Sequence, residues 1–255
     1  MTGRTTTFNG RFLTAAQTGV QRVARELLTA TDALLTGEGA GDAASCWRVL
    51  VPAARSPDPA RPRDLALSHM VREDAGALPG QAWEQLYLPV RTRGDLLVNL
   101  CNMAPLAHRR SITMIHDAQV FLTPRSYSAA FRAWYEVALP VIGRRSLRVL
   151  TVSNYSKAQL VRFGVAAAHR IDVVPNGSDH ILACPSSPDI LRTLGLEAQG
   201  YAVALSNTQA HKNIRILLQA AARPAFDGAR LVLVGGAGAE DFARLGFAPP
   251  PNVVF

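Results

Sequence analysis

Short runs of apolar residues, many of them β-branched, alternate with helical patterns along most of this chain, and this alternation limits the fold more than any other feature. Apolar residues with a helical period, such as Val20, Val23 and Leu27, lie between these runs. Strands that alternate with helices are typical of βαβ units and a parallel sheet, so we expect an α/β fold. The expected strands are residues 5–12, 46–51, 64–70, 96–100, 112–116, 149–152 and 171–174.

A connector divides the chain. Pro175-Asn176-Gly177 is a turn signal, and within residues 176–199 the run Pro185-Ser186-Ser187-Pro188 indicates a connector rather than core. A new strand–helix–strand pattern then begins at Tyr201. We therefore expect a first α/β domain over residues 1–178 and an incomplete second one over residues 190–255.

Two segments carry the signature of a helix start. Thr18 with Gln21 three residues later forms a capping box that opens the first helix. Ser156 with Gln159 gives the same pattern, and we expect a helix from there to about Phe163.

The charge of the chain limits the kinds of partner that it can bind. The net charge is +8, and of 27 basic residues only Lys157 and Lys212 are lysine. The arginines are scattered without interleaved aromatics, so we expect no nucleic-acid partner. A basic surface also suits anionic lipid, and four arginines are candidates for such a patch: Arg132, Arg144, Arg145 and Arg148.

The cysteine pattern and the lack of a signal-peptide core or a long apolar run indicate where the protein is located. The three cysteines have no metal-ligand spacing, and no acidic metal cluster occurs, so we expect a reduced compartment and no bound metal. The first residues have no apolar signal-peptide core, and no run of about 18 apolar residues occurs. We expect a cytoplasmic protein, with peripheral binding to the inner membrane face as the alternative.

Two candidate sites follow expected strands of the first domain, where open α/β sheets bind ligands. Gly19 at a helix start lets the backbone approach an anion; the alternative is that it only fits the first turn. His116 and Asp117 directly follow a strand and can bind sugar hydroxyls or handle protons; the alternative is a structural histidine and a turn-capping acid. Trp83-Glu84-Gln85 is assigned to core or surface.

The second domain offers a third candidate between its first strand and helix. The segment Ser206-Asn207-Thr208-Gln209-Ala210-His211-Lys212 places a rare lysine at a helix start, where the macrodipole disfavours a cation. A lysine beside free helix N–H groups suits a diphosphate. Gly235-Gly236-Ala237-Gly238 lacks the ending of a P-loop, so we expect close backbone packing there.

Together these segments resemble family-4 bacterial glycosyltransferases of the GT-B fold. The stretches that carry the resemblance are TGVQRVARELL (18–28), IHDAQVFLTPRSY (115–127), LTVSNYSKAQLVRFGV (150–165), VVPNGSD (173–179), SNTQAHKNIRILLQAA (206–221) and LVLVGGAG (231–238). The resemblance implies two Rossmann-like domains, of which the first binds the acceptor and the second the sugar nucleotide. It implies an enzyme that transfers a hexose, mannose or a similar sugar, with retention, to a cell-surface glycan or lipid-linked acceptor.

The resemblance also implies roles for the candidates. Gly19 lies near the donor phosphates, His116 with Asp117 acts at the donor sugar, and Lys212 binds the diphosphate without a metal. Asn207 stands near the place where many family members have an arginine. We expect these residues to face one groove between the domains.

Three alternatives remain. The family carries a pair of glutamates eight residues apart, and after Lys212 the acids are Asp227, Glu240 and Asp241. We therefore expect a C-terminally truncated enzyme that is inactive alone, or a non-catalytic binding fragment. A nucleotide-dependent oxidoreductase is disfavoured because no glycine fingerprint follows the first strand.

Overall fold

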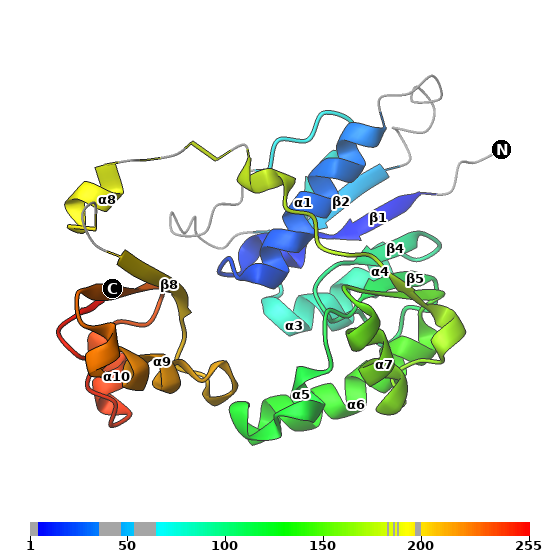
Figure 1. Cartoon of the computed structure of the whole chain (residues 1–255). Helices are drawn as coiled ribbons and strands as arrows, with labels where there is room; N and C mark the ends of the chain where they lie inside the picture. The colour runs from blue at the N-terminus through cyan, green and yellow to red at the C-terminus, as the bar shows by residue number, and fades with distance from the viewer. Residues whose placement is uncertain are drawn as a thin grey trace. The chain divides into compact units, whose positions relative to one another are not determined.

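The computed structural model describes residues 5–35, 47–53, 65–182, 184–185, 187, 189–196 and 200–255. It divides into two units, Met1–His180 and Ile181–Phe255. Figure 1 colours the first unit from blue to yellow-green and the second from yellow to red. Cys46, at the start of the second expected strand, and Asp64, at the start of the third, lie outside the described residues.

The first unit is built on a seven-stranded sheet in the order β3-β2-β1-β4-β5-β6-β7. Every pair of neighbouring strands is parallel; Phe8, for example, lies opposite Val49 on one side and Val98 on the other. The strands are β1 (Thr6–Asn9), β2 (Trp47–Val51), β3 (Val71–Asp74), β4 (Leu96–Asn99), β5 (Ser111–Met114), β6 (Arg148–Thr151) and β7 (Ile171–Val173). The strand order reverses between β1 and β4, which makes this position the topological switch point of the sheet.

Helices pack on both faces of this sheet. Val49 and Val51 pack against Ala24 and Leu28 of α1, whereas the intervening Leu50 packs with Trp83 from the opposite face. The helices of the first unit are α1 (Gly19–Leu34), α3 (Gly80–Ala82), α4 (Leu88–Arg91), α5 (Gln119–Leu122), α6 (Ala129–Arg145) and α7 (Asn154–Arg162). This arrangement confirms the expected α/β class with a parallel sheet.

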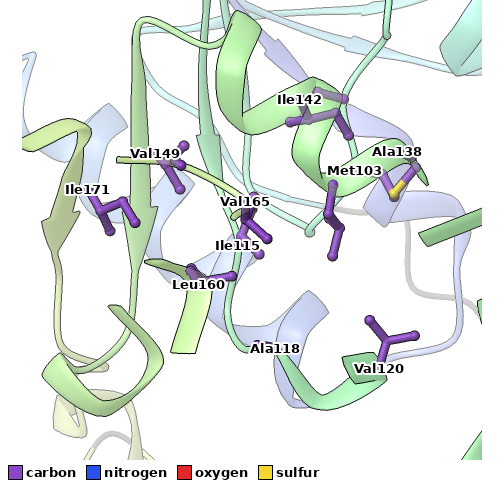
Figure 2. Packing of buried hydrophobic residues seen from close by; sticks show 13 residues of the cluster. Met103, Ile115, Ala118, Val120, Ala138, Ile142, Val149, Leu160, Val165 and Ile171 are labelled. Carbon is purple, nitrogen blue, oxygen red and sulfur yellow. The ribbon is translucent and has the colours of Figure 1, made fainter. Parts of the chain in front are cut away.

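One apolar cluster joins β6, β7 and the segment after β5 to α6 and α7. Figure 2 shows Ile115, Val149 and Ile171 facing Ile142 and Leu160 across this cluster. All of these side chains are at most 2% exposed, so this half of the sheet has a well-buried core. Close packing of this kind fixes the ends of β4 and β5, and therefore the loops that follow them.

The second unit has a three-stranded parallel sheet in the order β10-β9-β8. Its elements are α8 (Asp189–Thr193), β8 (Gly200–Ser206), α9 (Ile214–Ala221), β9 (Ala229–Gly235), α10 (Ala239–Arg244) and β10 (Val253–Val254). Ile214 and Leu218 of α9 and Phe242 of α10 cover Leu231 and Leu233 of β9.

Three sequence expectations were wrong in detail. The first strand, expected over residues 5–12, ends at Asn9, because Gly10–Thr14 forms a 3-10 turn. The expected strand at 64–70 is absent where described, because the carboxylate of Asp32 on α1 accepts the backbone N–H groups of Ser68, His69 and Met70; β3 begins only at Val71. The helix expected from Ser156 begins at Asn154, because the Ser153 hydroxyl accepts the Ser156 N–H at 3.0 Å and caps it. The box at Thr18 is confirmed: the Gln21 side-chain oxygen accepts the Thr18 N–H at 3.2 Å.

Candidate functional site

His116 is held by the segment that follows the neighbouring strand β4. Its backbone N–H donates to Oδ1 of Asn102 at 2.8 Å, and its ring Nε2 bonds the carbonyl of Leu100 at 2.8 Å. Asn102 adopts a positive φ of 62°, a conformation that asparagine tolerates better than most residues. The side chain of His116 is therefore fixed at the carboxyl edge of β4 and β5.

This environment fixes both the protonation state and the tautomer of the His116 ring. A carbonyl only accepts hydrogen bonds, so Nε2 must carry a proton. Burial lowers the pKa of His116 below its ordinary value, although the bond to Leu100 and the charge of Asp117 oppose the shift. The ring is thus neutral near pH 7, and its Nδ1 is left as a hydrogen-bond acceptor that suits a hydroxyl group.

Asp117 is exposed and has a local structural role. Its Oδ1 accepts the backbone N–H of Gln119 at 2.9 Å at the start of α5, which is the capping alternative considered from the sequence. Its charge also contributes to a raised pKa of Tyr127, after the larger effect of burial. A catalytic role for Asp117 stays a prediction.

Gly19 is the first residue of α1, and no packing contact among the described residues requires a glycine there. A Cβ built on it would have no atom within 4 Å. By contrast, a Cβ on Gly10 would lie 2.7 Å from the Leu50 carbonyl oxygen, so packing does require that glycine. Packing therefore does not explain the glycine at position 19, and a ligand that approaches the backbone would.

The segment after β4 brings these two candidates into one neighbourhood. Leu100 bonds His116, and the next residue, Cys101, has its Sγ 3.9 Å from the carbonyl oxygen of Val20 in the first turn of α1. Burial raises the pKa of Cys101 to about 12, so its thiol is neutral and is not a nucleophile.

A polar cluster that the sequence analysis missed lies at the same edge. Asn9 at the end of β1 donates to Glu84 at 2.7 Å and to Asn99 at the end of β4 at 3.0 Å, and Nε of Arg11 lies 3.2 Å from Glu84. Glu84 was assigned to core or surface. A signal existed, because Glu84 shares a helical stripe with the fully buried Trp83 and Leu88, and a charged residue on such a stripe needs a partner.

In the second unit, Asn207 lies where the loop after β8 meets the loop after β9. It lines two cavities of about 330 and 350 Å³, the first of them shared with Gln209 and Arg215 and the second with Gly236 and Asp241. Its Oδ1 accepts the Gln209 N–H at 2.8 Å, which shapes the loop. Cavities of this size can hold part of a nucleotide.

Lys212 follows in the same loop but lines neither cavity. It ends the short 3-10 turn at Ala210–Lys212, is exposed, and stands one residue before Asn213, whose positive φ of 50° redirects the chain into α9. In the glycine-rich segment, Gly235 packs closely on the end of β8, since a Cβ there would lie 2.6 Å from the Ser206 carbonyl oxygen, whereas a Cβ on Gly236 or Gly238 would meet no described atom within 4 Å.

The donor and catalytic roles of these residues stay predictions. The first unit brings Gly19 and His116 to one neighbourhood, whereas Asn207 and Lys212 belong to the second unit. A common groove between the units likewise stays a prediction.

Comparison with known proteins supports the resemblance. No protein-family model matches the chain. An Escherichia coli O-antigen chain mannosyltransferase B is 32% identical over 120 residues, which cover 45% of this chain and 32% of that protein. The chain thus spans about a third of the length of this curated relative.

Solved structures show the same fold over nearly the whole chain. The structure of the Anabaena protein HepE with UDP and glucose matches with a TM-score of 0.61 and 17% identity, over 99% of this chain and 69% of HepE. The HepE complex with UDP gives 0.60 and 18%, over 99% and 68%. With the mannosyltransferase match, these confirm the resemblance to glycosyltransferases of the GT-B fold.

Proposed function

We propose that this chain works in a glycosyltransferase that takes a sugar from a nucleoside diphosphate and transfers it, with retention, to a cell-surface glycan or lipid-linked acceptor. The transferred sugar is a hexose, with mannose as the first candidate. The similarity to an O-antigen mannosyltransferase supports the reaction, and the UDP bound to HepE supports the nucleotide donor.

The observation that carries this proposal is the loop between β8 and α9. It combines Asn207, which lines two cavities at the carboxyl edge of the sheet, with an exposed cation, Lys212, just before the helix N-terminus. A lysine and free helix N–H groups together bind a diphosphate. Both belong to the carboxyl edge at which open α/β sheets bind ligands.

The chemistry follows from charge. Cleavage of the bond between sugar and diphosphate leaves negative charge on the nucleoside diphosphate, and Lys212 stabilises that charge as it develops. His116, neutral and buried, accepts a hydrogen bond from a sugar hydroxyl through Nδ1. Asp117 and Gly19 complete the proposed first-unit contribution, and no bound metal is needed for these steps.

Calorimetric titration with UDP and GDP tests the donor half of the proposal. We expect Lys212→Gln to weaken binding about tenfold or more, since one hydrogen bond to a charged group contributes roughly 1.5–3 kcal/mol. Lys157→Gln, the same change at the other lysine of the chain, should leave binding unchanged. Equal affinities in all three proteins would contradict the role of Lys212.

We also propose that the protein is cytoplasmic and binds the inner membrane face peripherally. None of the helices in the described residues has the length and hydrophobicity needed to cross a bilayer. Exposed Arg144, Arg145 and Arg148 flank Leu147, which is 50% exposed. Two of the four arginines are in ion pairs, Arg132 with Glu136 at 3.5 Å and Arg148 with Asp172 at 3.7 Å. Flotation with anionic vesicles at low salt should carry the protein upward, and its retention in the lower fraction would refute membrane binding.

A further inference from the structure

The polar cluster at the switch point contains a buried ion pair with an unused oxygen. The side chain of Glu84 is only 2% exposed. Its Oε1 accepts Nδ2 of Asn9 at 2.7 Å and lies 3.2 Å from Nε of Arg11. Its Oε2 is buried and has no hydrogen-bond partner among the described residues.

Stability alone does not explain this arrangement. A buried ion pair often contributes no more than a well-packed apolar pair, and an unsatisfied buried oxygen is destabilising.

The backbone around Glu84 is also unusual, because residues Trp83–Tyr87 form a π-helical turn. Pro89 has no N–H and crowds the preceding turn, and the helix widens at Trp83–Tyr87 and then continues as α4. Such π turns are frequent at functional sites.

The position of the cluster points to a ligand. Asn9 and Asn99 end β1 and β4, the two neighbouring strands between which the order of the sheet reverses. Open α/β sheets bind their ligands at the carboxyl ends of strands at this switch point. The cluster is therefore placed where binding, rather than packing, explains a polar group.

The hydrogen-bonding capacity of the pair indicates which ligand fits. The side chain of Arg11 is 24% exposed, and its terminal nitrogens have no hydrogen-bond partner in the described part of the chain. Arginine only donates, and the ionised carboxylate of Glu84 only accepts. An anion would satisfy Arg11 but would be repelled by Glu84, whereas a hydroxyl group accepts from one and donates to the other.

We propose that Arg11 and Glu84 form a subsite for a hydroxyl group of a pyranose. Asn9 orients the carboxylate, and the sugar hydroxyl accepts from a terminal nitrogen of Arg11 and donates to Oε2 of Glu84. Cys101 and Tyr135 are neutral neighbours, because burial raises the pKa of each to about 12. The identification of the ligand as a sugar rests on the proposed function; the hydroxyl belongs either to the acceptor glycan or to the hexose of the donor.

Binding rather than transfer tests the subsite. Saturation-transfer NMR measures the affinity of the full chain for methyl α-D-mannopyranoside, and calorimetry measures GDP-mannose against GDP. We expect Arg11→Gln and Glu84→Gln to weaken glycoside binding about fivefold or more, as for loss of a charge-assisted hydrogen bond. Arg93→Gln is the matched control: Arg93 is exposed and lies before β4, at the opposite edge of the sheet. Thermal unfolding reports whether each variant is folded, and Arg11→Lys replaces Arg11→Gln if the latter is not.

The outcomes separate the possible sources. If the Arg11 and Glu84 variants bind the glycoside weakly but keep the wild-type ratio of GDP-mannose to GDP affinity, the hydroxyl belongs to the acceptor. If that ratio falls, it belongs to the donor hexose. Wild-type glycoside affinity in folded Arg11 and Glu84 variants, no glycoside binding by the wild-type chain, or displacement of the glycoside by inorganic phosphate would overturn the subsite. Failure of GDP and UDP to bind would instead contradict the proposed function. The glycoside measurement would still test the subsite, because it does not depend on nucleotide binding.

Discussion

Replacing Asp32 tests how the segment before β3 is held to α1. The carboxylate, 4% exposed, accepts the N–H groups of Ser68 at 2.7 Å, His69 at 3.0 Å and Met70 at 2.7 Å. In Asp32→Ala the exposed Ser68 N–H regains water, but the other two lose a charged acceptor. At roughly 1.5 kcal/mol for each of these bonds, we expect a loss of about 3 kcal/mol in the free energy of unfolding.

Asp32→Asn separates charge from shape. Its single oxygen can still accept from His69 and Met70, while the amide nitrogen faces the Ser68 N–H, so we expect a smaller loss of about 1–2 kcal/mol. Urea unfolding followed by circular dichroism measures both values, and Asp74→Ala, which removes an exposed ion pair with Arg72, should change stability by less than about 1 kcal/mol. Equal stability of Asp32→Ala and Asp74→Ala would refute the reasoning.

The pH dependence of Asp32 has a defined sign. Burial alone would raise the pKa of Asp32, but the three N–H donors outweigh it and hold the pKa below its ordinary value of 3.8. A depressed pKa gives stability that is present above the unfolded-state pKa and is lost as the pH falls through the folded-state value. The stability difference between the wild type and Asp32→Asn should therefore shrink below about pH 4.

Other predictions test the candidate site. Gly19→Ala should keep or slightly raise the melting temperature, because a Cβ there meets nothing and alanine favours helix, while weakening binding of UDP; unchanged UDP affinity would remove Gly19 from the donor site. Cys101, with its raised pKa, should resist iodoacetamide at pH 8 while exposed Cys184 is alkylated, as peptide mass spectrometry can show; rapid labelling of Cys101 would contradict its burial.

Much of the fold could be read from local pattern. The alternation of strands and helices predicted the parallel sheets, and Thr18 with Gln21 fixed the start of α1 because both groups lie within one turn. Local pattern failed where two residues were equally suited to one position, since Ser153 and Ser156 both suit a helix start and Ser153 is the residue that caps it. It also failed where a distant side chain decides, as Asp32 does for residues 68–70.

The candidate site divides in the same way. Gly19, His116 and Lys212 were found because each directly follows a strand or opens a helix. The pairing of Arg11 with Glu84 was missed, because the two residues are far apart in sequence and meet only through the order of β1 and β4. Only the topology of the sheet brings such residues to one edge.

The central claim, that a nucleoside diphosphate binds at the loop between β8 and α9, has a direct test in the lysine content of the chain. Lys157 and Lys212 are the only lysines, so acetylation with N-hydroxysuccinimidyl acetate followed by mass spectrometry reads each of them separately. At a UDP concentration that saturates the calorimetric titration, we expect acetylation of Lys212 to slow about fivefold or more, since a lysine bound to phosphate is a protonated, shielded amine. Acetylation of Lys157 should not change. Equal labelling of Lys212 with and without saturating UDP would contradict the claim.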